Sequence, residues 1–196
     1  EKKYYLEYLY DLLDLILKKE VDKNFEFPIS KNIEVNLKKI FSENHNYVGI
    51  APGAGEENKI WPLNNYIEIG KYLESKDYII VFYLGPNEKD YEQILKQNFQ
   101  NAIFLENEKS LDSFNNNEII MASTKFLKFA ISNDSGVSHM LSTNYCPLIK
   151  LFGPKDSVKF TPKLKNLITV SSSELNSDKI EDISISRVIK AIEDLD

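Results

Sequence analysis

Three segments of the sequence carry residues suited to binding a phosphorylated ligand. The first is Pro52-Gly53-Ala54-Gly55, which is followed by Lys59. Glycines let a backbone approach a ligand closely and leave amide groups for it, and a lysine can place a charge on a phosphate. The segment lacks the Gly-Lys-Ser/Thr of a Walker A loop and the spaced glycines of a dinucleotide fingerprint. A tight structural turn is the competing interpretation.

The second segment runs from Ser132 to His139 and reads Ser-Asn-Asp-Ser-Gly-Val-Ser-His. Asp134 or Ser135 is suited to cap a helix that begins at Gly136. Ser135 and Gly136 would then lie where backbone amides and the helix dipole favour an anion. His139, one turn further on, could donate to the same phosphate. A capped helix with a partly buried histidine is the competing interpretation.

The third segment is Gly85-Pro86-Asn87-Glu88. A carboxylate just past a strand end can accept hydrogen bonds from ribose hydroxyls, as acidic residues do in other nucleotide-binding folds. Glu88 could equally be a first-turn helix residue that the dipole favours. A fourth segment, residues 152–156, repeats the Gly-Pro theme and is expected to form a turn at the rim of the same cleft.

Other kinds of chemistry find little support. The sequence has two histidines and one cysteine, His45, His139 and Cys146, at separations that match no zinc site. It has no Gly-x-Ser-x-Gly elbow, so Ser135 and His139 do not indicate a hydrolase.

Apolar patterns predict the elements that position these segments. Strands that alternate with helices predict a parallel sheet with helices on both faces, an α/β Rossmann-like fold. Ligands bind beyond the carboxyl ends of such strands, where the three segments lie. The expected strands are 47–51, 78–84, 102–105, 130–132, 147–152 and 167–170, and the expected helices are 4–17, 62–73, 88–97, 118–129, 136–142 and 183–195.

The chain has 196 residues with 24 basic and 30 acidic side chains, a net charge of −6. This balance, with an isoelectric point near 5.1, argues against a nucleic-acid partner. A single cysteine cannot form an internal disulfide, and no apolar run is long enough to span a membrane, so we expect a cytoplasmic protein. We divide the chain into a helix at 1–20, a connector at 21–46 with a short helix at 35–41, and a nucleotide-sugar-binding domain at 47–196.

The order of these segments resembles the C-terminal domain of glycosyltransferase family 9, the bacterial lipopolysaccharide heptosyltransferases. The matching pieces are Pro52-Gly53-Ala54 with Lys59-x-Trp61-Pro62, Gly85-Pro86-x-Glu88, Asn133-Asp134-Ser135-Gly136-x-x-His139 and Leu151-Phe152-Gly153-Pro154. The combination is far more specific than any one piece and covers residues 47–195. It implies the C-terminal half of a GT-B fold, which binds the nucleotide-sugar donor, usually ADP-heptose.

By position, the resemblance implies that Gly53, Ala54 and Lys59 meet the donor phosphates and Glu88 the ribose. Asp134, Ser135, Gly136 and His139 would form the diphosphate and sugar end of the pocket. The reaction would be sugar transfer to a lipopolysaccharide core or related glycan, with neither metal nor cofactor, because these groups would stabilise the leaving diphosphate.

In this family the general base and the acceptor surface belong to an N-terminal domain, of which residues 1–20 could be the last helix. We regard Asp11 and Asp14 on that helix as solvated charges rather than as the base. The expectation is therefore a fragment that binds the donor but does not catalyse transfer alone. The acceptor would be a glycolipid met through the other domain, with peripheral association at the cytoplasmic face of the inner membrane. A stand-alone nucleotide-binding module without catalytic activity is the alternative.

Overall fold

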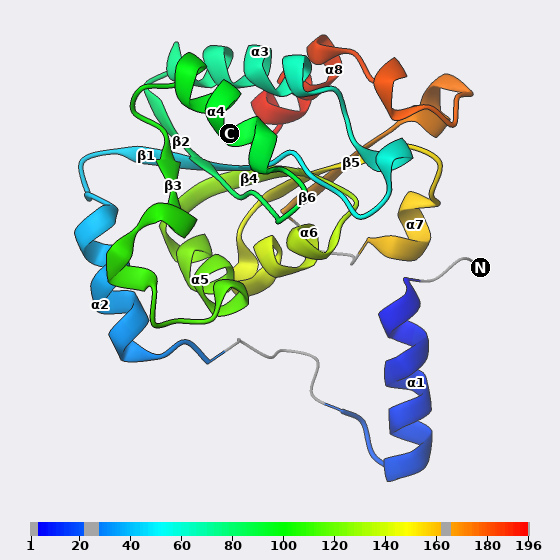
Figure 1. The fold of residues 1–196 in the computed structure, drawn as a ribbon. Coiled ribbons are helices and arrows are strands. Elements are labelled where there is room, and N and C mark those ends of the chain that lie inside the picture. Colours follow the sequence, from blue (N-terminus) through cyan, green and yellow to red (C-terminus); the bar gives the residue numbers. More distant parts are fainter. Residues whose placement is uncertain (1–3, 22–27, 162–165, 196) are drawn as a thin grey trace.

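The computed structural model describes residues 4–21, 28–161 and 166–195. Its centre is a parallel sheet of six strands in the order β3-β2-β1-β4-β5-β6 (Figure 1). This is the order of two mononucleotide-binding halves that meet between β1 and β4. The α/β Rossmann-like class predicted from the sequence is confirmed. The strands are β1 Asn46–Ala51, β2 Tyr78–Phe82, β3 Ile103–Phe104, β4 Leu127–Asn133, β5 Leu148–Phe152 and β6 Leu167–Ser171.

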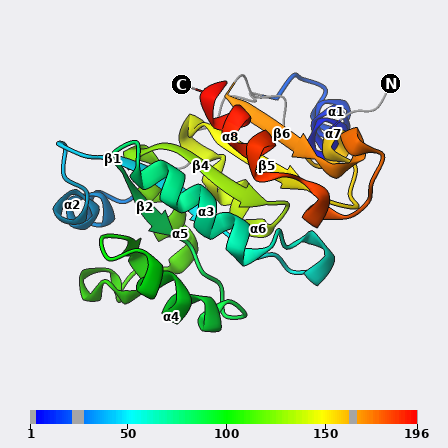
Figure 2. The same ribbon diagram turned by 90° about the horizontal axis from the view of Figure 1, so that it is seen from above.

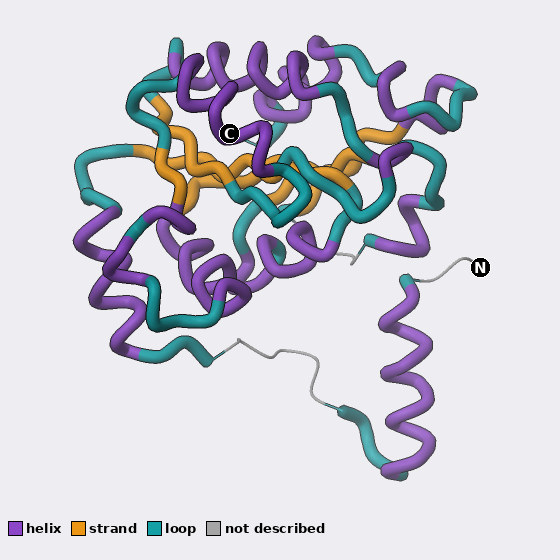
Figure 3. Tube along the Cα trace, viewed as in Figure 1, coloured by secondary structure: helices purple, strands orange, loops and turns teal. Residues whose placement is uncertain are grey.

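Helices cover both faces of the sheet, so that the strands form the middle of three layers (Figure 3). One face carries α3 (Leu63–Glu74), α4 (Lys89–Asn98) and α8 (Ile185–Glu193), and α3 and α8 lie side by side over it (Figure 2). The other face carries α2 (Lys31–Ile40), α5 (Asn116–Ser123) and α6 (Gly136–Leu141). A short α7 (Ser157–Phe160) connects β5 to β6.

Each face of the sheet has its own apolar core. Side chains alternate along a strand, so in β1 Val48 and Ile50 pack under α3 and α8, whereas Tyr47 and Ala51 pack toward α2, α5 and α6. Burial on both faces explains why the strands read as nearly continuous apolar runs in the sequence.

The predicted boundary between the fifth helix and the fourth strand is wrong. The helix expected at 118–129 ends as α5 at Ser123, and β4 begins at Leu127 rather than at residue 130. Leu127 and Phe129 are both buried but pack on opposite faces of the sheet, because a register shift against β1 makes the exposed Lys128 between them an extra residue. Phe129 pairs with Val48 of β1, so sheet pairing decides the conformation here.

The N-terminal part contains two helices. The helix expected at 4–17 is confirmed as α1 (Tyr5–Leu17), and it stands apart from the sheet in Figure 1. Its exposed apolar side chains are Tyr8, Leu9, Leu12, Leu13, Leu15, Ile16 and Leu17.

The second of these helices, α2, lies in the segment predicted as a connector. It begins earlier than the expected helix at 35–41, because Ser30 caps it by accepting a hydrogen bond from the Ile33 amide. Ile33 and Leu37 are fully buried in the core below the sheet. Residues 22–27 lie outside the described residues, and the division into domains stays a prediction.

Candidate functional site

The candidate site lies at the carboxyl ends of β1, β2 and β4, the central strands of the sheet. Because β1 pairs with both β2 and β4, the loops that follow these strands meet at one edge. These are the three segments that the sequence singled out. The point between β1 and β4, where the two halves of the sheet diverge, is where ligands bind in open α/β sheets.

Glu88 has a buried carboxylate at this edge, with 7% of the residue exposed. Its Oε2 accepts a hydrogen bond from the Gly85 amide at 2.7 Å, and Oε1 accepts none from the described residues. A Cβ on Gly53 would lie 2.3 Å from the carboxyl carbon of Glu88, and one on Gly85 would lie 2.5 Å from its Oε2. The two glycines therefore allow the chain to close around this carboxylate. Glu88 is also the N-cap residue of α4, as the competing interpretation expected, but its side chain makes no cap hydrogen bond there and is held by Gly85 instead.

A hollow of about 240 Å³ opens beside Glu88. This is near the lower end of small-molecule pockets, which begin at about 300 Å³. It brings together Gly53, Ala54, Glu88, Ser135 and Gly136, five of the residues predicted to bind the donor. The remaining lining residues are Ala51, Gly55, Tyr83, Gly85, Pro86, Asn87, Val137 and Met140.

None of these eight residues was predicted to bind the donor, and three of them, Tyr83, Val137 and Met140, bring apolar side chains. They give the hollow an apolar side suited to a flat ring. Burial raises the pKa of Tyr83, whose hydroxyl is 2.7 Å from that of Ser123, so this group stays protonated. Only their positions could have indicated this role, because Tyr83 is the last residue but one of the predicted strand 78–84 and Met140 lies one turn after Gly136.

Asn133, the last residue of β4, is fully buried and ties the two loops together. Its Oδ1 accepts hydrogen bonds from the Tyr66 hydroxyl at 2.8 Å and the Trp61 amide at 3.2 Å. Its Nδ2 donates to the carbonyls of Pro52 at 2.7 Å and Gly53 at 3.4 Å. Burial keeps the pKa of Tyr66 well above its usual value, which maintains that hydroxyl as a donor. The side-chain amide of Asn133 therefore fixes the loop of residues 52–55, called the glycine loop below, relative to the start of α6.

The first turn of α6 is closed by a reciprocal cap. The Ser135 hydroxyl accepts from the Ser138 amide at 3.3 Å, and the Ser138 hydroxyl accepts from the Ser135 amide at 3.4 Å. Ser135 is therefore the cap, and Asp134 is not. The amides of Gly136 and Val137 have no acceptor within the helix, and both residues line the hollow.

The other predicted residues, Lys59, Asp134 and His139, do not line the hollow. Asp134, which directly precedes Ser135, is 8% exposed. Its Oδ1 forms an ion pair with the Lys150 ammonium at 2.8 Å, and its Oδ2 forms one with the Lys59 ammonium at 3.7 Å. Lys59 also contacts Glu56 at 2.7 Å, and this hydrogen bond holds the pKa of the Glu56 carboxyl below its usual value. An ionic cluster thus lies next to the hollow, and sequence reasoning missed its buried member, Lys150.

His139 lies on the exposed side of this cluster. Partial burial of its ring and, second, the ammonium of Lys150 lower its pKa, against the opposing carboxylate of Asp134. Its imidazole is therefore neutral at pH 7 and can act as a hydrogen-bond donor or acceptor.

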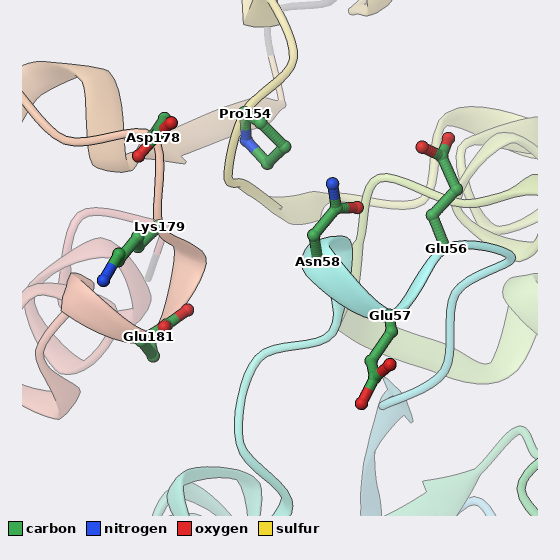
Figure 4. A pocket seen from close by; sticks show the side chains of 7 residues that line it. All are labelled: Glu56, Glu57, Asn58, Pro154, Asp178, Lys179 and Glu181. Carbon is green, nitrogen blue, oxygen red and sulfur yellow. The ribbon is translucent and has the colours of Figure 1, made fainter.

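A larger hollow, of about 760 Å³, lies to one side and differs in charge. In Figure 4, residues of the loop after β1 face residues of the segment between β6 and α8. Its lining consists of Glu56, Glu57, Asn58, Pro154, Asp178, Lys179 and Glu181. Four carboxylates against one ammonium make this hollow unfavourable for a diphosphate.

The part of the chain that the structure describes lacks two features. It holds no group of three or more His, Cys, Asp or Glu side chains placed to bind a metal ion. Nor does any helix there combine the length and apolarity needed to cross a bilayer.

Comparison with known proteins identifies the family. The model of glycosyltransferase family 9 (heptosyltransferase) matches residues 5–187. The chain belongs to this family. It is 30% identical to lipopolysaccharide heptosyltransferase 2 of Escherichia coli over 122 residues, which are 61% of this chain and 34% of that protein. It is 27% identical to lipopolysaccharide heptosyltransferase 1 of Campylobacter coli over 168 residues, 80% of this chain and 49% of that protein. The chain thus spans about a third to a half of the length of these curated relatives.

Solved structures of family 9 proteins share the fold. A family 9 glycosyltransferase from Veillonella parvula superposes on the whole chain with a TM-score of 0.83 at 18% identity, and the match covers 60% of that protein. The E. coli heptosyltransferase WaaC with ADP gives a TM-score of 0.74 at 18% identity, covering 100% of this chain and 58% of that one. The prediction of a family 9 glycosyltransferase with a Rossmann-like half of a GT-B fold is confirmed.

Proposed function

We propose that the hollow beside Glu88 binds the nucleoside diphosphate of a nucleotide-sugar donor. The observation that carries the proposal is the Glu88 carboxylate, which is buried between two glycines, held at one oxygen by the Gly85 amide and left with the other oxygen for a ligand. Ribose hydroxyls are suitable donors to such an oxygen. The related fold of WaaC was solved with ADP, which supports an adenine nucleotide as the first ligand to test.

The diphosphate would extend from the ribose toward Ser135, Gly136 and Lys59. Unpaired amides at the start of α6 and the Lys59 ammonium are the groups that would receive its negative charge. Lys59 is 16% exposed and its partner Glu56 is half exposed, so phosphate oxygens can replace Glu56 at the ammonium without burying that carboxylate. Asp134 and His139, beyond Lys59, would then face the sugar.

The reaction that follows is transfer of a sugar, which we take to be heptose, to a hydroxyl of a lipopolysaccharide core or related glycan. The bond between the sugar and the diphosphate breaks as the acceptor oxygen bonds to the same carbon, and the acceptor proton passes to a base. Lys59 and the amides of α6 would stabilise the developing charge on the leaving diphosphate, without metal or other cofactor. We place the base, the glycolipid acceptor site and any peripheral contact with the cytoplasmic face of a membrane in a second domain, so that this chain binds donor without catalysing transfer.

Calorimetry with ADP, UDP, GDP and CDP tests the nucleotide site. We expect one of them, with ADP first, to bind below millimolar concentration. If none does while circular dichroism shows a folded chain, the nucleotide site is refuted. Glu88→Gln should weaken binding about tenfold, because a charge-assisted hydrogen bond is replaced by a neutral one. Glu74→Gln is the matched control, since Glu74 is exposed at the far end of α3, at the opposite edge of the sheet.

A transfer assay tests the division of labour. The chain alone should bind ADP but release none from ADP-heptose in the presence of acceptor glycan. Release of ADP at an enzymatic rate would show that a base lies within these 196 residues.

A further inference from the structure

Lys150 is a lysine in the middle of a buried strand. It lies in β5 between Ile149 and Leu151, and 1% of the residue is exposed. Ile149 and Leu151 pack into the core on the side of α3 and α8. Lys150 therefore points to the other face, where Leu148 packs and α6 lies. A buried ammonium is costly unless it is paired and hydrogen-bonded, so its partners show what it is for.

The ammonium of Lys150 has partners on two sides. It donates to the carbonyl of Phe160 at 3.0 Å and lies 4.9 Å from the ring centre of Phe152. Its charged partner is Oδ1 of Asp134 at 2.8 Å. Burial lowers the pKa of Lys150, and Asp134 opposes that shift, which ties the protonated state of the lysine to this carboxylate.

Charges alternate from Lys150 out to the glycine loop. The second oxygen of Asp134 is 3.7 Å from Lys59, and Lys59 contacts Glu56 at 2.7 Å. If Lys150 were absent, Lys59 would be the one remaining lysine partner of Asp134 among these contacts. Asp134 would then compete with a diphosphate for the Lys59 ammonium, and its own charge would repel the diphosphate.

We propose that Lys150 is a positioning residue of the donor site: its buried ammonium holds and neutralises Asp134, which leaves Lys59 available to the diphosphate. The inference rests on the proposed function and extends it to a residue that does not line the hollow. A purely structural role, in which Lys150 only anchors Phe160 and the end of α7, would affect folding without distinguishing between ligands that differ in charge.

Calorimetry on Lys150→Met tests the proposal, because methionine keeps much of the length and apolar contact and removes the charge. We expect the Kd for ADP to rise at least tenfold and the Kd for adenosine to stay within twofold of wild type, since adenosine carries no phosphate. Lys128→Met, at an exposed lysine of β4, is the matched control and should change neither Kd.

The double variant Lys150→Met/Asp134→Asn removes both charges. It should return the Kd for ADP to within about threefold of wild type, because no uncompensated carboxylate is left beside Lys59. A neutral pair also replaces a buried ion pair at little cost in folding, so this variant keeps the test open if Lys150→Met alone does not fold.

The outcomes separate the two proposals. Wild-type protein that binds no nucleotide refutes the proposed function, and this inference falls with it. Wild-type binding together with an unchanged ADP-to-adenosine ratio in Lys150→Met overturns the inference alone. So does a folded double variant that still binds ADP tenfold more weakly than wild type.

Discussion

Gly53→Ala should abolish the contact between Glu88 and the ribose without unfolding the protein. The new methyl group would lie 2.3 Å from the carboxyl carbon and 2.4 Å from Oε1 of Glu88, whereas ordinary contact begins at 3.4 Å. The carboxylate would have to move by about 1.1 Å to relieve this overlap. Such a shift breaks the 2.7 Å hydrogen bond from the Gly85 amide that holds the carboxylate in place.

The expected loss follows from the bonds that the displaced carboxylate would make. Hydrogen bonds to a charged group contribute about 1.5–3 kcal/mol. Since 1.4 kcal/mol is a factor of ten in affinity, the Kd for ADP should rise by about 10- to 100-fold. The free energy of unfolding should change little, because Glu88 can turn outward through the open hollow beside it.

Calorimetry with ADP and with its 2′,3′-dideoxy analogue would measure this effect. Wild-type protein should prefer ADP, and Gly53→Ala should bind the two ligands equally. Glu74→Ala is the control, because Glu74 is exposed at the opposite edge of the sheet and does not line the hollow. It should leave ADP affinity unchanged. A Gly53→Ala variant that binds ADP within twofold of wild type and keeps the preference would refute the ribose role of Glu88.

Three more predictions concern the residues around the hollow. Lys59→Ala should weaken ADP binding by about 1–3 kcal/mol and leave adenosine binding unchanged, as titration calorimetry would show; equal losses for both ligands would contradict a phosphate contact. Asn133→Ala should lower the free energy of unfolding by about 3 kcal/mol, because it leaves buried partners without hydrogen bonds, and urea denaturation with Asn32→Ala, an exposed amide of α2, as control would measure it. For His139 the lowered pKa means that the unfolded chain takes up a proton first, so stability is retained above pH 6.5 and declines below it. His139→Gln should therefore lose less stability than wild type between pH 7 and pH 5 in parallel urea titrations, and identical slopes would contradict the shift.

The order of strands and helices could be predicted from the sequence because most elements are bounded by glycine, proline or capping residues. The segment 124–128 has no such boundary residue, and its apolar residues fit a helix as well as a strand. Pairing of Phe129 with Val48 decides for the strand, and that contact links residues far apart in the chain.

The candidate site was predictable where a loop directly follows a strand. Gly53, Glu88, Ser135 and Gly136 meet at one hollow because parallel strands present their carboxyl ends at one edge. The partners of Lys150 could not be predicted in this way, since its environment depends on the turn of α7 and on Asp134, which follows the neighbouring strand β4. The lysine itself was visible as a single charge within the apolar run Leu148–Phe152.

The strand order also determines how readily different parts of the chain open. β1 and β4 are flanked by strands on both sides, whereas β3 is an edge strand of two residues. Local opening is cheapest at such edges and costs most in the interior of a sheet. Amide hydrogens of β1 and β4 should therefore exchange with solvent more slowly than those of β3. The loops that hold Gly53 and Ser135 begin where these two strands end. A nucleotide that binds between them would therefore meet an ordered site, and little conformational entropy of the loops would be lost on binding.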